Sequence, residues 1–185
     1  MTRPDPADRS DRVTDLFVST TPLDPRAKPL VDQLTQEYVT RYGSDFGDPP
    51  GAEMTRYPPE AFASPDGHFL LLLRDGAAIA GGAFKRFDAR TAELKRVWTD
   101  AAFRRQGLAR RVVAELEAQA LRQGYARAYL TTGFRQPEAK GLYLGLGYTP
   151  LFDLTVDPET YGILPFEKAL PGAALRHTGP QSSAA

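Results

Sequence analysis

The sequence predicts one mixed α/β domain built around a single sheet. Two observations in the 185-residue chain support this prediction. Three apolar stretches follow one another between residues 69 and 99 with turn signals between them, which is typical of consecutive strands. The period then changes, because apolar residues between 109 and 120 recur at helical spacing. Strands and helices in one chain of this length favour a single α/β domain.

Charge balance and composition exclude several classes of protein. Basic and acidic residues number 23 each, which argues against a general nucleic-acid binder or a membrane-surface protein. No run of about 18 apolar residues is present, so we expect no membrane-spanning helix. The chain has no cysteine and two histidines, His68 and His177, so a metal site or a Ser-His-Asp triad is poorly supplied and we expect no metal.

Both ends of the chain have the composition of disordered tails. Residues 1–12 are rich in Pro, Asp and Arg, and residues 171–185 end in Gly-Pro-Gln-Ser-Ser-Ala-Ala, with little to bury. The folded domain is therefore expected over residues 13–170. The first twelve residues contain no apolar segment of a secretory signal, so a cytoplasmic location is the expectation.

Hydrophobic period and turn residues locate the expected elements along this domain. Strands are expected at residues 13–20, 69–73, 79–87, 93–99, 126–132, 149–154 and 164–170. Helices are expected at residues 24–43, 109–124 and 137–146. A loop rich in Gly, Pro and Asp is expected at residues 44–59, where substrate contacts often lie.

Two local patterns give sharper expectations about the sheet. The run at residues 69–73 is apolar throughout, which predicts a strand buried on both faces, and Asp75-Gly76 is a hairpin signal after it. Gly81-Gly82 lies inside the next strand. This pair predicts a bulge or the close approach of another segment.

The residues from Arg104 to Arg110 are the most informative for chemistry. They precede a helix, and the free N–H groups and the dipole of a helix start can bind a phosphate. Gly107 would let an anion approach the backbone, Ala109 would keep the first turn thin, and arginines at 104, 105, 110 and 111 would add charge. The alternative is a glycine turn that starts a helix beside solvated arginines, and the spacing alone leaves both open. The pattern is neither a Walker loop nor a three-glycine dinucleotide motif.

Three blocks, in this order along the chain, resemble the GNAT superfamily of N-acetyltransferases. Glu93-Leu94-Lys95-Arg96-Val97-Trp98-Thr99 resembles the family's fourth strand. Arg-x-x-Gly-x-Ala at residues 104–109 looks like its acyl-CoA signature, and residues 141–148 resemble its block of Leu-Tyr followed by Gly-aromatic. The resemblance covers about residues 13–170.

The resemblance implies a fold and a cofactor site. It implies a twisted, mostly antiparallel sheet of six to seven strands flanked by helices and splayed between strands four and five, with the pantetheine arm of acetyl-CoA in the splay. Two residues depart from the family pattern: Ala101 stands where proline is common, and Gln136 where asparagine is common. The cofactor-binding residues implied are Val97, Trp98, Thr99, Arg104, Arg105, Gln106, Gly107, Leu108, Ala109, Arg110, Gln136 and Ala139.

The resemblance also implies two catalytic residues. Acetyl transfer to an amine needs a neutral amine, a donor to the carbonyl oxygen and a proton for the leaving thiolate. Glu93 is implied as the base, directly or through water, and Tyr143 as the acid. Glu93 could instead pair with a neighbouring Lys95 or Arg96, and Tyr143 could simply pack in the core. The carbonyl donor would be a backbone N–H around residues 97–99.

These residues together predict an N-acetyltransferase that uses acetyl-CoA. The acceptor is expected to be a primary amine of a small molecule, such as an amino acid, a polyamine or a drug-like amine. With no cysteine, direct attack in a ternary complex is expected. The alternatives are a protein or peptide N-acetyltransferase and a non-catalytic acyl-CoA-binding module. Asp45, Asp48 and Glu53 are expected beside the acceptor, where acidity suits a cationic amine. No nucleic acid or membrane partner is expected, and a homodimer stays open.

Overall fold

The computed structural model describes residues 14–43, 49 and 52–171. Residues 1–12 and 172–185 lie outside these ranges, so the two predicted tails stay predictions. Most of the predicted loop before residue 52 lies outside them too, including Asp45 and Asp48. No helix in the described ranges is long and apolar enough to cross a membrane.

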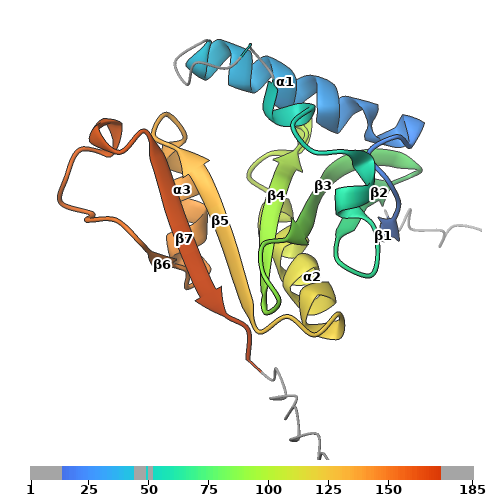
Figure 1. Ribbon diagram of the computed structural model, residues 1–185. Helices are drawn as coiled ribbons and strands as arrows, with labels where there is room; N and C mark the ends of the chain where they lie inside the picture. Colours follow the sequence, from blue (N-terminus) through green and yellow to red (C-terminus); the bar gives the residue numbers. More distant parts are fainter. Residues whose placement is uncertain (1–13, 44–48, 50–51, 172–185) are drawn as a thin grey trace, which may run out of the picture.

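One seven-stranded sheet organises the described residues, in the order β1-β2-β3-β4-β5-β7-β6 (Figure 1). The strands are β1 (Asp15–Ser19), β2 (His68–Arg74), β3 (Ala77–Arg86), β4 (Thr91–Thr99), β5 (Arg127–Gly133), β6 (Thr149–Pro150) and β7 (Ile163–Ala169). The helices are α1 (Lys28–Tyr42), α2 (Leu108–Arg122) and α3 (Pro137–Gly145). Every neighbouring pair of strands is antiparallel except β4 and β5, which are parallel. The predicted α/β class and mostly antiparallel sheet are confirmed.

Helices cover both faces of the sheet. β2 is buried on both sides, as its apolar run predicts: Leu70 and Leu72 belong to the core under α2, whereas Phe69 and Leu71 belong to the core under α1. Figure 1 shows α2 behind β3 and β4, and α3 behind β5 and β7. The buried face of α2 follows the predicted helical spacing, with Leu108, Val112, Val113, Leu116 and Ala120.

The glycine pair in β3 allows α2 to approach the sheet. A Cβ on Gly82 would meet side-chain atoms of Leu116 and Val112 at 3.0 Å, so a larger residue would push α2 away. The pairing of β3 with β4 also shifts register between Gly81 and Ala83. Both the close approach and the bulge that this pair predicts are therefore present.

Two expected elements have different bounds in the structure. The first helix begins at Lys28, because Asp24 caps a separate 3-10 turn at Pro25–Ala27 by accepting the N–H of Arg26 at 2.8 Å. The strand expected at residues 149–154 ends at Pro150. A local turn replaces its second half, since Asp153 accepts hydrogen bonds from both the N–H and the hydroxyl of Thr155.

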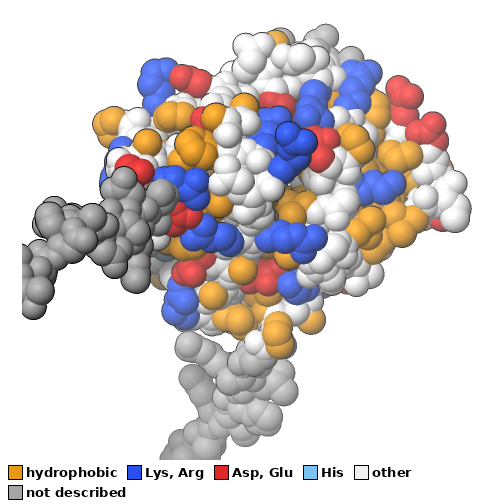
Figure 2. All heavy atoms as spheres, turned by 180° about the vertical axis from the view of Figure 1, so that it is seen from behind, with side chains coloured by type: hydrophobic (Ala, Val, Ile, Leu, Met, Phe, Trp, Pro, Cys, Tyr) orange, Lys and Arg blue, Asp and Glu red, His pale blue; other side chains and the backbone are white. Residues whose placement is uncertain are grey.

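The surface carries mixed charge. Seen from behind, Lys and Arg side chains are spread among acidic and apolar ones and do not gather into one large patch (Figure 2). This distribution agrees with the equal numbers of basic and acidic residues in the sequence.

Candidate active site

The sheet opens between β4 and β5. These strands pair only from Thr91 to Glu93, opposite residues 127–129, whereas β5 continues to Gly133 along β7. Beyond Glu93, β4 therefore has no partner strand on its β5 side, and the gap is visible in Figure 1. This is the splay that the resemblance predicts between the fourth and fifth strands.

A bulge in β4 bends the strand at the splay. Gly81 pairs with Trp98 and Ala83 with Lys95, so Gly82 alone faces both Arg96 and Val97. Arg96 has a φ of 57°, a left-handed conformation that is uncommon outside glycine and is often found at functional sites. The bulge turns the backbone of residues 97–99 relative to the first half of the strand.

The start of α2 forms the second wall of the splay. Gly107 is its N-cap, with a φ of 74°, and no side chain caps the first turn. Arg105 also has a positive φ, 63°. The space next to the α-carbon of Gly107 is open: a Cβ at this position would have no neighbouring atom within 4 Å. The first N–H groups of this 15-residue helix are thus left for an anion.

The arginines around this turn have different environments. Arg104 forms an ion pair with Glu37 at 3.4 Å, and Arg110 donates to the carbonyl of Gly145 at 3.1 Å. Arg111, which the sequence suggested as a further cation here, instead pairs with Asp15 of β1. Arg111 does not line the cavity, because its guanidinium is held by Asp15 at the edge strand.

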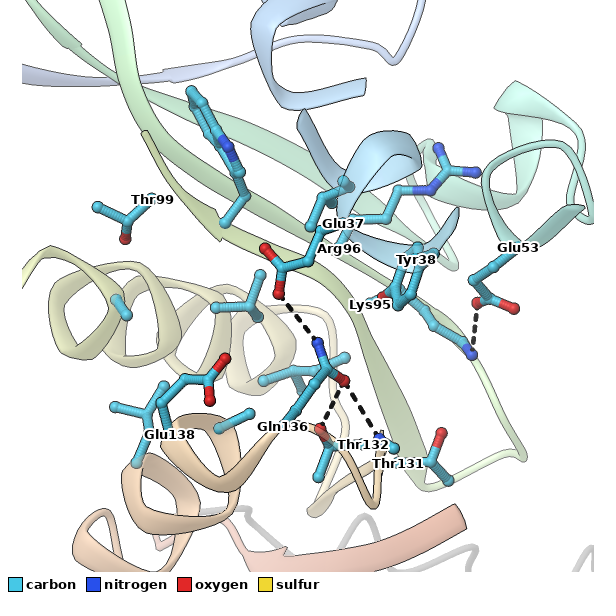
Figure 3. Close-up of a pocket in the computed structure, with 18 of the residues that line it drawn as sticks. Glu37, Tyr38, Glu53, Lys95, Arg96, Thr99, Thr131, Thr132, Gln136 and Glu138 are labelled. Carbon is cyan, nitrogen blue, oxygen red and sulfur yellow. Dashed lines mark hydrogen bonds and ion pairs between the residues drawn. The ribbon is translucent and has the colours of Figure 1, made fainter. Parts of the chain in front are cut away.

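A cavity of about 780 Å³ fills the splay (Figure 3). It is lined by residues from α1, β4, the α2 start, the end of β5 and α3. All the predicted cofactor residues line it except Gln106, whose side chain accepts a hydrogen bond from Arg74. Thr99 lines the cavity, and within the described residues its Oγ1 is buried without a hydrogen-bond partner. A buried polar atom of this kind is open to a ligand.

Tyr143 lies in the wall on the α3 side. Its side chain is 7% exposed and packs edge-to-face on Tyr148, with ring centroids 5.6 Å apart. Tyr143 lines the cavity, as a proton donor would, and it also belongs to the hydrophobic core, as a packing residue would. Burial raises the pKa of the Tyr143 phenol above its usual value, so the hydroxyl stays protonated at neutral pH.

Glu93 lies outside the residues that line the cavity, between two lysines. Its carboxylate contacts Lys85 Nζ at 2.7 Å and Lys95 Nζ at 3.1 Å, and the residue is 6% exposed. The sequence left open that Glu93 pairs with Lys95, and this ion pair is present. Glu93 itself is buried. Its role as base stays a prediction.

Charged residues from β4 and from the turn Ala52–Met54 line the end of the cavity opposite Thr99 (Figure 3). Glu53, in the turn Ala52–Met54, contacts Lys95 at 3.0 Å and Arg56 at 3.5 Å. Figure 3 shows Lys95 and Glu53 at one end of the cavity and Thr99 at the other. Burial lowers the pKa of Lys95, but Glu53 and Glu93 outweigh burial and raise it, so Lys95 stays charged.

Hydrogen bonds join the two sides of the splay at its mouth. Gln136 accepts from Thr132 Oγ1 at 2.9 Å and from the N–H of Gly133 at 3.2 Å, and it donates to Glu37 of α1 at 3.4 Å. Arg41 of α1 pairs with both Glu37 and Glu138 of α3. Sequence reasoning missed Glu37 and Glu138, because a polar residue on a helix gives no local signal that distinguishes a cavity wall from solvent.

The sequence that builds this site matches a known family. Residues 31–148 match the sequence model of the Acetyltransferase (GNAT) family. The chain belongs to this family. GNAT domains are acyltransferases that use acyl-CoA.

Individual relatives agree with this assignment. The chain is 34% identical over 92 residues to the uncharacterized N-acetyltransferase YsnE of Bacillus subtilis (strain 168), an alignment that covers 46% of this chain and 61% of YsnE. It thus spans about three fifths of that relative's length.

Solved structures share the fold. PaiA N-acetyltransferase from Thermoplasma acidophilum, in complex with coenzyme A, is 15% identical with a TM-score of 0.60, covering 84% of this chain and 99% of that one. The GNAT domain of S. lividans PAT is 18% identical with a TM-score of 0.61, covering 85% and 97%. At these identities the likeness is one of fold.

Proposed function

We propose that this GNAT domain transfers an acetyl group from acetyl-CoA to a primary amine of a small molecule, by direct attack in a ternary complex. The observation that supports this most directly is one continuous cavity that runs from the start of α2 past Tyr143 to the polar end at Lys95. A donor and an acceptor can therefore meet inside the splay.

The residues of the splay suit acetyl-CoA. The open turn at Gly107 and the uncapped start of α2 suit a pyrophosphate, and Arg104, Arg105 and Arg110 line the cavity beside it. Thr99 Oγ1 offers an unused hydrogen bond to a polar group of the pantetheine arm. Acetyl-CoA would supply the thioester, so that transfer forms an amide N–C bond, breaks the C–S bond, removes one proton from the amine and returns one to sulfur.

Tyr143 is the residue we assign to the sulfur proton. The residue lines the cavity, and its raised pKa keeps the hydroxyl a proton donor at neutral pH. A backbone N–H in residues 97–99 would polarise the acetyl carbonyl, because the pairing of β4 with β5 ends at Glu93 and leaves this segment without a partner strand on its β5 side. The resemblance implies Glu93 as the group that removes the amine proton, directly or through water. Because its carboxylate contacts Lys85 and Lys95 and does not line the cavity, we propose a positioning role for Glu93, which holds Lys95, with solvent taking the proton; the pH profile described below decides between the two roles.

A small acceptor fits the enclosure of the cavity. Its volume lies within the usual range for small-molecule sites, about 300–1,000 Å³. The ties from Arg41 to Glu138 and from Gln136 to Glu37 join α1 to α3 beside the cavity, where a peptide substrate would need an open groove. The presence of Tyr143 in the wall favours turnover over mere acyl-CoA binding.

A thiol-release assay with a panel of amines tests this proposal. With acetyl-CoA and small primary amines, we expect CoA release that depends on the amine and saturates with it. Release from peptide N-termini alone would favour the protein acetyltransferase. Tight acetyl-CoA binding with no thiol released by any amine would support the non-catalytic module and overturn the proposal.

A further inference from the structure

The acceptor end of the cavity has more positive than negative charge. Four charged side chains line it there among the described residues: Lys95, Arg56 and Arg96 against Glu53. Behind them, Lys85 and Glu93 balance each other. The part of this wall that the structure describes therefore has an excess of two positive charges.

The positive charges are held in a partly dry environment. Lys95 is 13% exposed, and its ammonium group lies 5.4 Å from the ring centre of Tyr57, which also contacts Lys85 at 4.7 Å. The Arg96 residue is 7% exposed. Its guanidinium donates to the carbonyl of Met54 at 2.8 Å and stacks over Phe62, and in the described part of the chain no carboxylate forms an ion pair with it. Water screens such charges poorly, so their effect reaches into the cavity.

The other acidic residues of the cavity do not cancel this excess. Glu37 pairs with Arg41 and Arg104, and Glu138 pairs with Arg41, so both carboxylates already have cationic partners near the α2 end. The acceptor end is thus electrostatically distinct from the mouth.

This charged wall lies next to the expected reaction centre. Tyr38, which lines the cavity, interacts electrostatically with Glu53 and Lys95 and also with Tyr143. Glu53 and Lys95 thus share a neighbour, Tyr38, with the proposed acid, and they lie at the end of the cavity opposite Thr99 (Figure 3).

We infer that the acceptor is an amine that also bears a carboxylate, with the carboxylate bound by Lys95 and Arg56. This inference rests on the proposed acetyl transfer and narrows its substrate class. A carboxylate compensates the excess of positive charge, whereas a diamine or polyamine would add to it. The cationic wall also disfavours an ammonium ion, which promotes the neutral amine that attacks. Glu53 is left to accept a hydrogen bond from that amine.

Matched acceptors test this inference. We would compare the common L-α-amino acids with their carboxamides, which keep the side chain and amine but lose the negative charge, and with linear aliphatic diamines. For the preferred side chain, we expect kcat/KM to be at least about tenfold higher for the acid than for the amide, a difference of about 1.4 kcal/mol. Equal values, or a preference for amides or diamines, would overturn the carboxylate site and leave acetyl transfer in place.

Variants of Arg56 and Lys95 test whether these residues cause the preference for the acid over the amide. Arg56→Gln and Lys95→Gln should each lower kcat/KM much more for the acid than for the amide, and so remove most of the preference for the acid. Arg86→Gln, which removes an exposed arginine paired with Asp66, is the matched control and should keep the preference. A preference that survives in both site variants would overturn the assignment.

Binding of the acid and the amide tests the carboxylate site even if the enzyme acetylates neither. Trp98 is the single tryptophan of the chain and lines the cavity, so its fluorescence reports on ligands there. If no amine is acetylated but the acid changes the fluorescence and the amide does not, the carboxylate site stands and the proposed function fails. If neither acid nor amide binds, or both bind equally, the inference is overturned.

Discussion

The known packing contacts of Tyr143 are made by its ring. The ring packs between Tyr148 and Phe166, whereas the residue also lines the cavity. Removing the hydroxyl therefore leaves the packing in place, which makes this position suitable for a clean test of proton donation.

We expect Tyr143→Phe to bind acetyl-CoA with nearly unchanged affinity and to lose about a hundredfold in kcat. Isothermal titration and the thiol-release assay measure the two quantities. Tyr148→Phe is the control: its hydroxyl donates to Glu117 at 2.8 Å away from the cavity, so it should lose about 1 kcal/mol of stability but keep its kcat. Wild-type turnover by Tyr143→Phe across pH would transfer the acid role to another group or to solvent.

Glu93 is the residue whose assignment depends most on kinetics. Because Lys85 and Lys95 both contact its carboxylate, we expect Glu93→Gln to change the KM of the acceptor a few-fold at each pH and to leave the pH dependence of kcat unaltered. The range from about pH 6 to about pH 10 brackets the relevant groups. Glu115→Gln, which removes a partner of Arg122 on α2, should behave as wild type.

The base role gives the opposite pattern for Glu93→Gln. A rate that falls at neutral pH and recovers as pH rises toward the pKa of the acceptor would contradict the positioning role. It would then support Glu93 as the group that accepts the amine proton.

At the scale of elements, the start of α2 joins sequence, geometry and chemistry. Gly107 has a positive φ that a β-branched residue adopts at a cost of roughly 1–2 kcal/mol, and its open side faces away from other protein atoms. Backbone shape and not side-chain charge is expected to dominate acetyl-CoA binding there.

We expect Gly107→Val to weaken acetyl-CoA binding at least about tenfold and Arg105→Ala to weaken it only a few-fold. Gly147→Val is the control, because Gly147 also has a positive φ, 81°, and open surroundings but does not line the cavity. It should lose stability and keep its affinity. Equal, small changes of the dissociation constant in all three variants would contradict the phosphate-binding turn.

The edge strand β1 gives a prediction about stability. Asp15 pairs with Arg74 of β2 and with Arg111 of α2, and hydrogen bonds from these arginines lower the pKa of its carboxyl to about 2. The ordinary value is 3.8, so the stabilisation is complete above that pH and is lost as pH falls through about 2. Asp15→Asn should lose about 1–2 kcal/mol at pH 7 and approach wild type near pH 2. Urea unfolding at both pH values measures this, and a deficit independent of pH would contradict it.

At the scale of the whole molecule, the sequence predicts local features better than contacts across the splay. Gly81-Gly82 indicated the bulge, and Gly107 indicated the helix start, because glycines mark backbone geometry directly. The partners of Glu37 could not be predicted: Gln136 is 99 positions away, and α1 approaches α3 only once the sheet has formed. The ion pair between Glu53, in the turn Ala52–Met54, and Lys95 of β4 likewise joins residues 42 positions apart.

In the proposed reaction, an acetyl group moves from acetyl-CoA to a small amine inside the splay. Mass spectrometry of the enzyme mixed with acetyl-CoA and the amine panel, with free CoA measured in parallel, tests this most directly. We predict one acetyl group on the acceptor amine for each CoA released, and loss of both in Tyr143→Phe. CoA released without acetylated amine, or an acetyl group that appears only on the protein, would contradict direct transfer in the cavity.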